Sequence, residues 1–324
     1  MTLATRALAP ESFAPENFAQ EVAASGSGAP LDPKGYYDEQ GYVVFPKLIP
    51  EPVIDRMMSL YRRDILPTKA KFYRQNTNVY DTNRLTEHGH VIQSFLDVHH
   101  YKRFPEFRQS ALDLYFSPEL LQALSLVTGH PHHNLMQSML FDANAATPPH
   151  QDWWYLDTVP NGNLLGAWIA LEDIHEDAGR FYVMPGTQHV RLDEPNLPHS
   201  EWLARMRDFL DRNPHRVKAP ALRKGDVLFW NSRTIHGALE TRDRSRSRKS
   251  LTAHFMPSTM TFGNLFTSKP WVQYEEHGQH RYFANQPEHS FKAEMVSRLK
   301  VAVYDSPRLM KLVRKVQRRS VADT

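Results

Sequence analysis

The sequence contains no cysteine among its 324 residues. This absence excludes disulfides, thiolate chemistry, Cys-ligated zinc and iron–sulfur sites, so any metal must be held by histidine and carboxylate side chains. No apolar run approaches the ~20 residues that span a bilayer. The first residues, MTLATRALAPESF, lack the apolar core of a secretory signal, and the acidic Glu11, Glu16 and Glu21 argue against a transit peptide. We therefore expect a cytoplasmic protein.

The chain also has little excess charge, with a net charge of +3. Residues 308–319 carry six basic side chains and no acid, so the remainder is mildly acidic. That distribution differs from a basic nucleic-acid-binding domain, and we expect no nucleic-acid partner. Within 308–319 the apolar residues follow helical spacing. Such a helix could lie against the inner face of a membrane, or pack as an ordinary C-terminal helix with solvated charges. Both interpretations stay open.

Three regions are expected along the chain. Residues 1–32 are rich in Ala, Ser, Pro and Gly and predict a disordered arm. Residues 33–290 predict one folded domain, and residues 291–324 predict a helical, basic tail. Near the start, 41–45 predicts a strand and 50–63 a helix.

Helical and extended patterns separate near residue 133. Ser117 and Pro118 predict the start of a helix that Gly129 ends. Beyond it, short runs rich in β-branched and aromatic residues predict strands, with one inserted helix at 201–213. The pattern predicts a mainly β protein with a jelly-roll core flanked by N- and C-terminal helices. The predicted strands are 134–143, 164–174, 179–186, 226–231 and 248–256.

The segment His150-Gln151-Asp152 carries the strongest chemical signal. In an extended chain, residues i and i+2 point to the same side, so both side chains can reach one ion. A distant histidine would complete a two-His, one-carboxylate site, the arrangement typical of non-haem Fe(II) oxygenases. His236, which follows a predicted strand and precedes Gly237, suits this role. A second copy of the spacing, at 175–177, lies in a polar turn and is interpreted as a solvated loop.

Other residues near these positions suggest a pocket. Arg248 begins the predicted strand that follows His236. Its guanidinium could bind the distal carboxylate of 2-oxoglutarate, with Arg246 as the alternative. Trp153, Trp154 and Tyr155 either wall a substrate pocket or pack within the fold, and both interpretations stay open.

The segments HQDWWYLDT, GAWIALEDIHEDAGRFYVMPGTQH, KGDVLFWNSRTIHG and RKSLTAHF resemble the phytanoyl-CoA dioxygenase family. The resemblance runs from about Gly35 to Met256. It implies a double-stranded β-helix (a cupin-like jelly roll), Fe(II), 2-oxoglutarate as co-substrate and O₂. It places iron on His150, Asp152 and His236.

The resemblance also assigns residues around the iron. It favours Arg248 over Arg246 for the co-substrate, matches Trp168 to a residue lining that site, and places Gln137 and Met139 on a contributing strand. Relatives often have serine two residues after the distal histidine, where this chain has Ala238; Thr252 could supply the missing donor. His189 matches a structural loop residue.

The expected activity is 2-oxoglutarate-dependent hydroxylation of an aliphatic C–H bond, with release of succinate and CO₂. The substrate would be a small molecule, an acyl group or a lipid-linked sugar. A catalytically inactive jelly-roll binding protein is the alternative. A zinc hydrolase with the same three ligands is a third hypothesis, but it would give Arg248 no role.

Overall fold

The computed structural model describes residues 32–193, 197–304 and 306. Four α-helices lie among the described residues before Gly129: α2 (Pro33–Gln40), α3 (Glu51–Leu60), α4 (Pro105–Tyr115) and α5 (Pro118–Thr128). A π-helical turn, Tyr61–Ile65, continues α3. The predicted limits of α5 are confirmed: the Ser117 hydroxyl accepts a hydrogen bond from the Leu120 amide, and Gly129 takes the left-handed conformation that stops the helix. Helix α4 was not predicted.

Eight strands form the main sheet, in the order β1-β9-β7-β11-β5-β14-β13, with β4 beside β5. All neighbours are antiparallel except β14 and β5. The five predicted strand segments all contain strands. The bounds are β1 (Tyr42–Phe45), β4 (Phe95–Leu96), β5 (His133–Phe141), β7 (Leu165–Ala170), β9 (Val227–Asn231), β11 (Ser250–Pro257), β13 (Glu275–His277) and β14 (His280–Tyr282).

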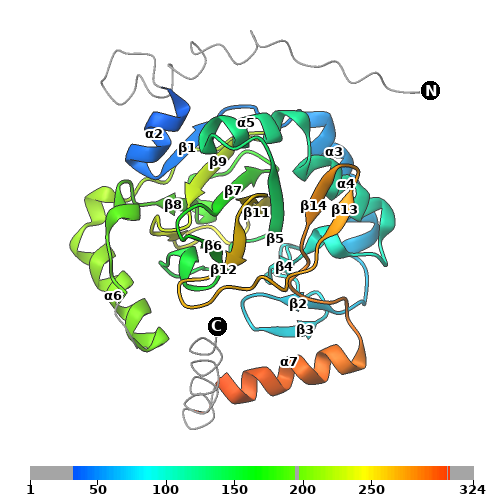
Figure 1. Cartoon of the computed structure of the whole chain (residues 1–324). Helices are drawn as coiled ribbons and strands as arrows, with labels where there is room; N and C mark the ends of the chain where they lie inside the picture. Colours follow the sequence, from blue (N-terminus) through cyan, green and yellow to red (C-terminus); the bar gives the residue numbers. More distant parts are fainter. Residues whose placement is uncertain (1–31, 194–196, 305, 307–324) are drawn as a thin grey trace.

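Three two-stranded sheets complete the extended structure: β10 (His236–Ala238) with β8 (Phe181–Val183), β12 (Thr261–Gly263) with β6 (Asp157–Val159), and β2 (Phe72–Arg74) with β3 (Val79–Asp81). In the described residues the strands do not close into a barrel, and β8 and β10 form a separate pair. Figure 1 shows β8 beside the main sheet. The predicted mainly β, double-stranded β-helix class with flanking helices is confirmed.

The central strands divide the interior in two. Along β7, β9 and β11, Ile169, Phe229 and Leu251 join a large apolar cluster that includes buried residues of α3, α4 and α5. The alternate residues Trp168 and Trp230 instead pack with residues of β8. Because strand side chains alternate between faces, one set of strands builds a helix-covered core and a second, inner face.

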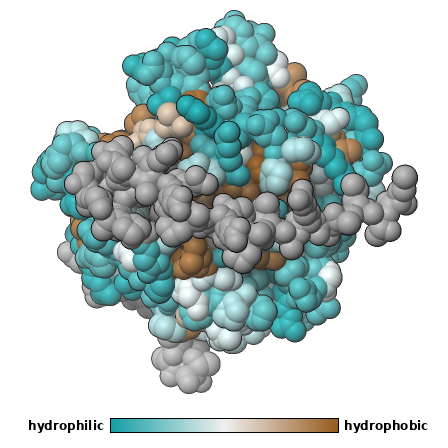
Figure 2. All heavy atoms as spheres, turned by 90° about the horizontal axis from the view of Figure 1, so that it is seen from above, coloured by the Kyte–Doolittle hydropathy of each residue, from teal (hydrophilic) through white to brown (hydrophobic). Residues whose placement is uncertain are grey.

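Two more helices lie at the periphery, α6 (His199–Arg212) and α7 (Phe291–Tyr304), close to their predicted positions (Figure 1). Seen from above, the surface is mostly hydrophilic, with smaller apolar patches toward the middle of that face (Figure 2). No helix in the described ranges is both long and apolar enough to cross a membrane.

The predictions of a disordered arm before Asp32 and a basic helix at 308–319 fall outside the described residues, and the domain limits stay predictions. The 3₁₀ turns are Val98–His100, Asp152–Trp154, Glu176–Ala178, Thr187–His189 and Pro214–Arg216.

Candidate metal centre

His150 and His236 face each other across an antiparallel bridge. The amide of each donates to the carbonyl oxygen of the other at 3.0 Å, and the imidazole centroids lie 4.2 Å apart. His236 opens β10, which pairs with β8. Beyond it, Gly237 leaves no room for a side chain, because an added Cβ would lie 2.8 Å from the Tyr182 hydroxyl. Two histidines distant in sequence are therefore held side by side by the backbone.

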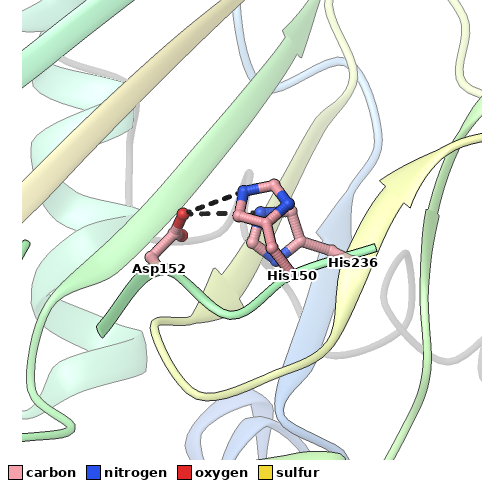
Figure 3. A group of neighbouring side chains, drawn as sticks. All are labelled: His150, Asp152 and His236. Carbon is pink, nitrogen blue, oxygen red and sulfur yellow. Dashed lines mark ion pairs between the residues drawn. The ribbon is translucent and has the colours of Figure 1, made fainter. Parts of the chain in front are cut away.

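Asp152 supplies the carboxylate. Gln151 is extended (φ −120°, ψ 136°), as the i, i+2 argument requires, but Asp152 begins a 3₁₀ turn instead of ending a strand. Its Oδ1 lies 3.5 Å from the Nε2 atoms of both His150 and His236 (Figure 3). One ligand atom from each of the three residues lies within 4.8 Å of the others. The structure thus brings together the three residues that the sequence singled out.

The outer nitrogens of both imidazoles are held by the backbone. Nδ1 of His150 lies 2.9 Å from the Pro148 carbonyl oxygen, and Nδ1 of His236 lies 2.9 Å from that of Thr234. A carbonyl oxygen only accepts, so each Nδ1 carries a proton, and each Nε2 is the nitrogen that can offer a lone pair to a metal. Two neutral imidazole nitrogens and one carboxylate oxygen match the donor set of non-haem Fe(II) sites, so these residues fit an iron ion.

The second oxygen of Asp152 has partners of its own. Oδ2 accepts from the Trp230 indole Nε1 at 2.8 Å and lies 3.2 Å from Nε2 of His254. Burial alone would raise the pKa of Asp152, but the imidazoles of His236 and His254 hold it well below its ordinary value. Asp152 is therefore an anion with Oδ1 free to bind a cation. Trp230 and His254 were not predicted as site residues. The alternation of strand side chains puts both on the inner face, but nothing local indicates Asp152 as their partner.

Arg248 lies at the edge of the same site and is 2% exposed. Its Nη1 donates to the Gly179 carbonyl oxygen at 3.0 Å, and its Nε has no hydrogen-bond partner in the described part of the chain. Burial lowers the pKa of Arg248 to about 10, so it remains a cation at neutral pH. Arg246, the alternative, is exposed and pairs with Asp243 at 3.2 Å. Only Arg248 therefore offers a buried cation beside the His–Asp–His group.

A cavity of about 440 Å³, open on one side, connects these groups. Trp168, Met139 and Thr252 line it, in keeping with the resemblance, and so does Ala238. Gln137 pairs with His254 across β5 and β11 and is not among the lining residues, so its predicted co-substrate contact stays a prediction. The lining residues are Gln75, Met139, Phe141, Thr147, His150, Asp152, Trp168, Phe181, Trp230, His236, Gly237, Ala238, Arg248, Thr252 and His254.

The three aromatic residues after Asp152 separate in space. Trp153 is buried, donates to Gln151 Oε1 at 3.1 Å and packs under the Arg233 guanidinium. Trp154 stacks on Trp202 of α6, with centroids 4.5 Å apart. Neither lines the cavity, so the packing alternative describes both. The 3₁₀ turn causes this, because it directs successive side chains away from the alternation of a strand.

Tyr155 is the member of this group that stays near the metal centre. Its ring centroid lies 6.0 Å from that of His150, and its hydroxyl is 2.6 Å from Nε2 of His199. Tyr155 is exposed and sits outside the cavity lining, so its contact with substrate stays a prediction.

The two histidines set aside by the sequence analysis lie in loops. His175 is exposed and caps the 3₁₀ turn Glu176–Ala178, with its Nδ1 accepting from the Asp177 amide. His189 is exposed in the turn Thr187–His189. Among the described residues, the group that could hold a metal is His150, Asp152 and His236.

Comparison with known proteins adds independent information. A sequence model described as phytanoyl-CoA dioxygenase (PhyH) matches residues 37–250. Peroxisomal phytanoyl-CoA dioxygenase of Homo sapiens is 27% identical over 241 residues, covering 69% of this chain and 68% of that protein. Phytanoyl-CoA dioxygenase domain-containing protein 1 of Danio rerio is 31% identical over 135 residues, covering 40% and 44%.

Solved structures show the same fold at lower identity. The epimerase SnoN in complex with Fe³⁺, alpha ketoglutarate and nogalamycin RO is 17% identical, with a TM-score of 0.54, covering 78% of this chain and 97% of SnoN. EctD from S. alaskensis with 2-oxoglutarate and 5-hydroxyectoine is 17% identical, with a TM-score of 0.54, covering 82% and 87%.

Proposed function

Because the chain belongs to the phytanoyl-CoA dioxygenase family of Fe(II)/2-oxoglutarate-dependent oxygenases, we propose that it hydroxylates an aliphatic C–H bond of an organic substrate. The reaction consumes one 2-oxoglutarate and one O₂. One oxygen atom enters succinate as CO₂ leaves, and the other enters the substrate as a hydroxyl group. The convergence of His150, Asp152 and His236 carries this proposal.

The three side chains would hold the iron. His150 and His236 offer Nε2 lone pairs, and Asp152 offers Oδ1 while Trp230 and His254 engage Oδ2. When bound, iron in such a site would supply a centre that binds the co-substrate and activates O₂. The protein's own contribution is to fix three donors on one side of the cavity and to keep Asp152 ionised in a dry environment.

Arg248 would bind the distal carboxylate of 2-oxoglutarate. A buried guanidinium without a paired carboxylate group is costly unless a ligand supplies the opposite charge. Its free Nε faces no protein acceptor, and Thr252 lines the same cavity. A hydrolase that used the same three metal ligands would leave this buried cation without a function.

The substrate would enter on the apolar side of the cavity. Phe141, Phe181 and Trp168 give the cavity apolar walls, which would limit the access of water to the reacting C–H bond. These walls suit an aliphatic group of a small molecule, of an acyl chain or of a lipid-linked sugar.

The duplicated His-x-Asp motif provides a matched test. Under anaerobic conditions, wild-type protein with Fe(II) and 2-oxoglutarate should develop a weak visible charge-transfer band, and with O₂ it should form succinate. His150→Ala and Asp152→Ala should lose both signals, whereas His175→Ala, in the exposed motif, should keep both. Retention of the band in both metal-site variants, or its loss in His175→Ala, would refute the assignment.

A further inference from the structure

Helix α7 (Phe291–Tyr304) presents apolar side chains to solvent. Phe291, Met295 and Leu299 are 79%, 56% and 66% exposed, and Val296 beside them is also exposed. Residues spaced by four lie above one another on a helix, so the first three form one continuous stripe. Large exposed apolar groups scattered singly are ordinary, but a contiguous row marks an interaction site.

The side of α7 that faces the protein carries polar or small side chains, together with the partly buried Ala293 and Val301. Glu294 binds Lys71 at 2.8 Å and His289 at 2.9 Å, and the Ser297 side chain is buried. A surface helix of a globular protein normally turns its apolar side inward. Helix α7 has the opposite orientation: polar contacts attach it to the protein, and its apolar stripe faces outward.

The charges that flank the stripe are positive. Lys292, Arg298 and Lys300 are exposed, whereas the one acid of the helix, Glu294, is engaged by the inward contacts and Arg298. The sequence beyond the helix adds six basic residues within 308–319 and no acid. A second copy of this surface would bring like charges together, so the surface favours an anionic partner.

We propose that α7 docks on an anionic lipid surface. Its stripe would enter the headgroup boundary while Lys292, Arg298 and Lys300 contact lipid phosphates, which is the behaviour of an interfacial amphipathic helix. A flat bilayer suits a stripe of exposed side chains on a peripheral helix.

Docking would also orient the metal site. Helix α7 packs against β3, and Figure 1 shows it along the outer side of the β2–β3 hairpin. Gln75, between those two strands, lines the cavity. The lipid surface would therefore lie on the hairpin side of the protein. Together with the proposed function, this arrangement favours a substrate that is itself lipid-linked.

Co-sedimentation with vesicles tests the docking without any enzymatic assay. Metal-free full-length protein is mixed with vesicles of phosphatidylcholine, alone or with phosphatidylglycerol. We expect binding to the anionic vesicles, weakened by salt. The triple variant Phe291→Ser/Met295→Ser/Leu299→Ser should bind at least about tenfold more weakly, because three side chains lose their apolar burial. Trp271→Ser, which removes an aromatic side chain that is 71% exposed elsewhere, is the matched control and should bind like wild type.

Three outcomes would overturn the proposal. The triple variant could bind as tightly as wild type, which would assign binding to residues outside α7. Binding could be equal with and without phosphatidylglycerol. Light scattering could instead show a dimer that the triple variant abolishes, which would make a second copy the occupant of the stripe. Circular dichroism and the anaerobic charge-transfer band, both unchanged in the triple variant, would show that the fold and the metal site are intact.

Discussion

The two faces of the main sheet share strands but differ in chemistry. On β9, Phe229 faces the helices while Trp230 donates to Asp152. On β11, Leu251 and Ala253 belong to the helix-covered core, while Thr252 and His254 line the cavity. Adjacent residues of one strand therefore have different roles. The helix-covered face stabilises the fold by apolar burial, whereas the cavity face holds buried polar groups that lower stability.

The helix-covered face of the sheet should determine the free energy of unfolding. Phe229 is fully buried and packs edge-on against Phe45, with centroids 5.5 Å apart. Phe229→Ala should lower the free energy of unfolding by roughly 3–5 kcal/mol, measured by urea denaturation, because it leaves a cavity. The Fe(II) affinity of the variant that remains folded should stay within about threefold of wild type. A large loss of iron affinity in the folded variant would contradict the separation of the two faces.

A buried carboxyl group without imidazole partners sharpens the contrast with Asp152. Burial raises the pKa of Asp97 to about 7, although the Gln286 amide donates to it at 2.8 Å. The folded state then keeps a proton that the unfolded chain loses near pH 4, so this group destabilises the protein as the pH rises from about 4 to 7.

Asp97→Asn removes that titration. Relative to wild type, the variant should gain roughly 3 kcal/mol in free energy of unfolding between pH 4 and pH 8. Asparagine also tolerates the left-handed conformation of this position (φ 53°). Parallel stability curves for the two proteins across this pH range would show that the buried carboxyl does not titrate as expected.

On the inner face, Arg248 should affect the co-substrate and leave the fold intact. Arg248→Met should raise the 2-oxoglutarate concentration for half-maximal turnover by about 30–100-fold, as expected when one charge-assisted pair is lost. The free energy of unfolding should not fall, because the variant removes a buried cation without a paired carboxylate group. Arg246→Met, which alters the exposed neighbour, should leave both quantities unchanged. Equal effects from the two substitutions would argue against Arg248 as the carboxylate partner.

Substitution of His254 should have the smallest effect of the four substitutions predicted here, because His254 acts on the metal only through Asp152. His254→Phe should weaken Fe(II) binding by about 10–100-fold, measured by anaerobic titration, since it removes one donor that orients the carboxylate. The absorption spectrum of the Co(II)-substituted protein should also change, because Oδ2 becomes freer to approach the metal. His254→Gln, which restores an N–H donor, should recover part of the affinity. An unchanged Co(II) spectrum in His254→Phe would leave His254 with a packing role alone.

Much of the site could be predicted because its key signals are local. His150 and Asp152 needed only an extended Gln151 between them, and Arg248, two residues before β11, continues the alternation that puts Thr252 and His254 on the inner face. The sequence left two interpretations open for Trp153 and Trp154, a pocket wall or packing, because nothing local shows that a 3₁₀ turn carries them. Trp230 and His254 were missed because their partner, Asp152, lies 78 and 102 residues away in the chain.

The sequence alone determined the composition of the metal group, the positions of five of the eight strands of the main sheet and the need for histidine and carboxylate ligands in a chain without cysteine. It also predicted a helical tail from residue 291 onward. Only the tertiary structure decided that Oδ1 of Asp152 stays free while two distant donors hold Oδ2, and that α7 turns its apolar side outward. The physical reason is the same in both cases. Backbone periodicity decides which residues share a face, but the environment that each face meets depends on packing between segments that are remote in sequence.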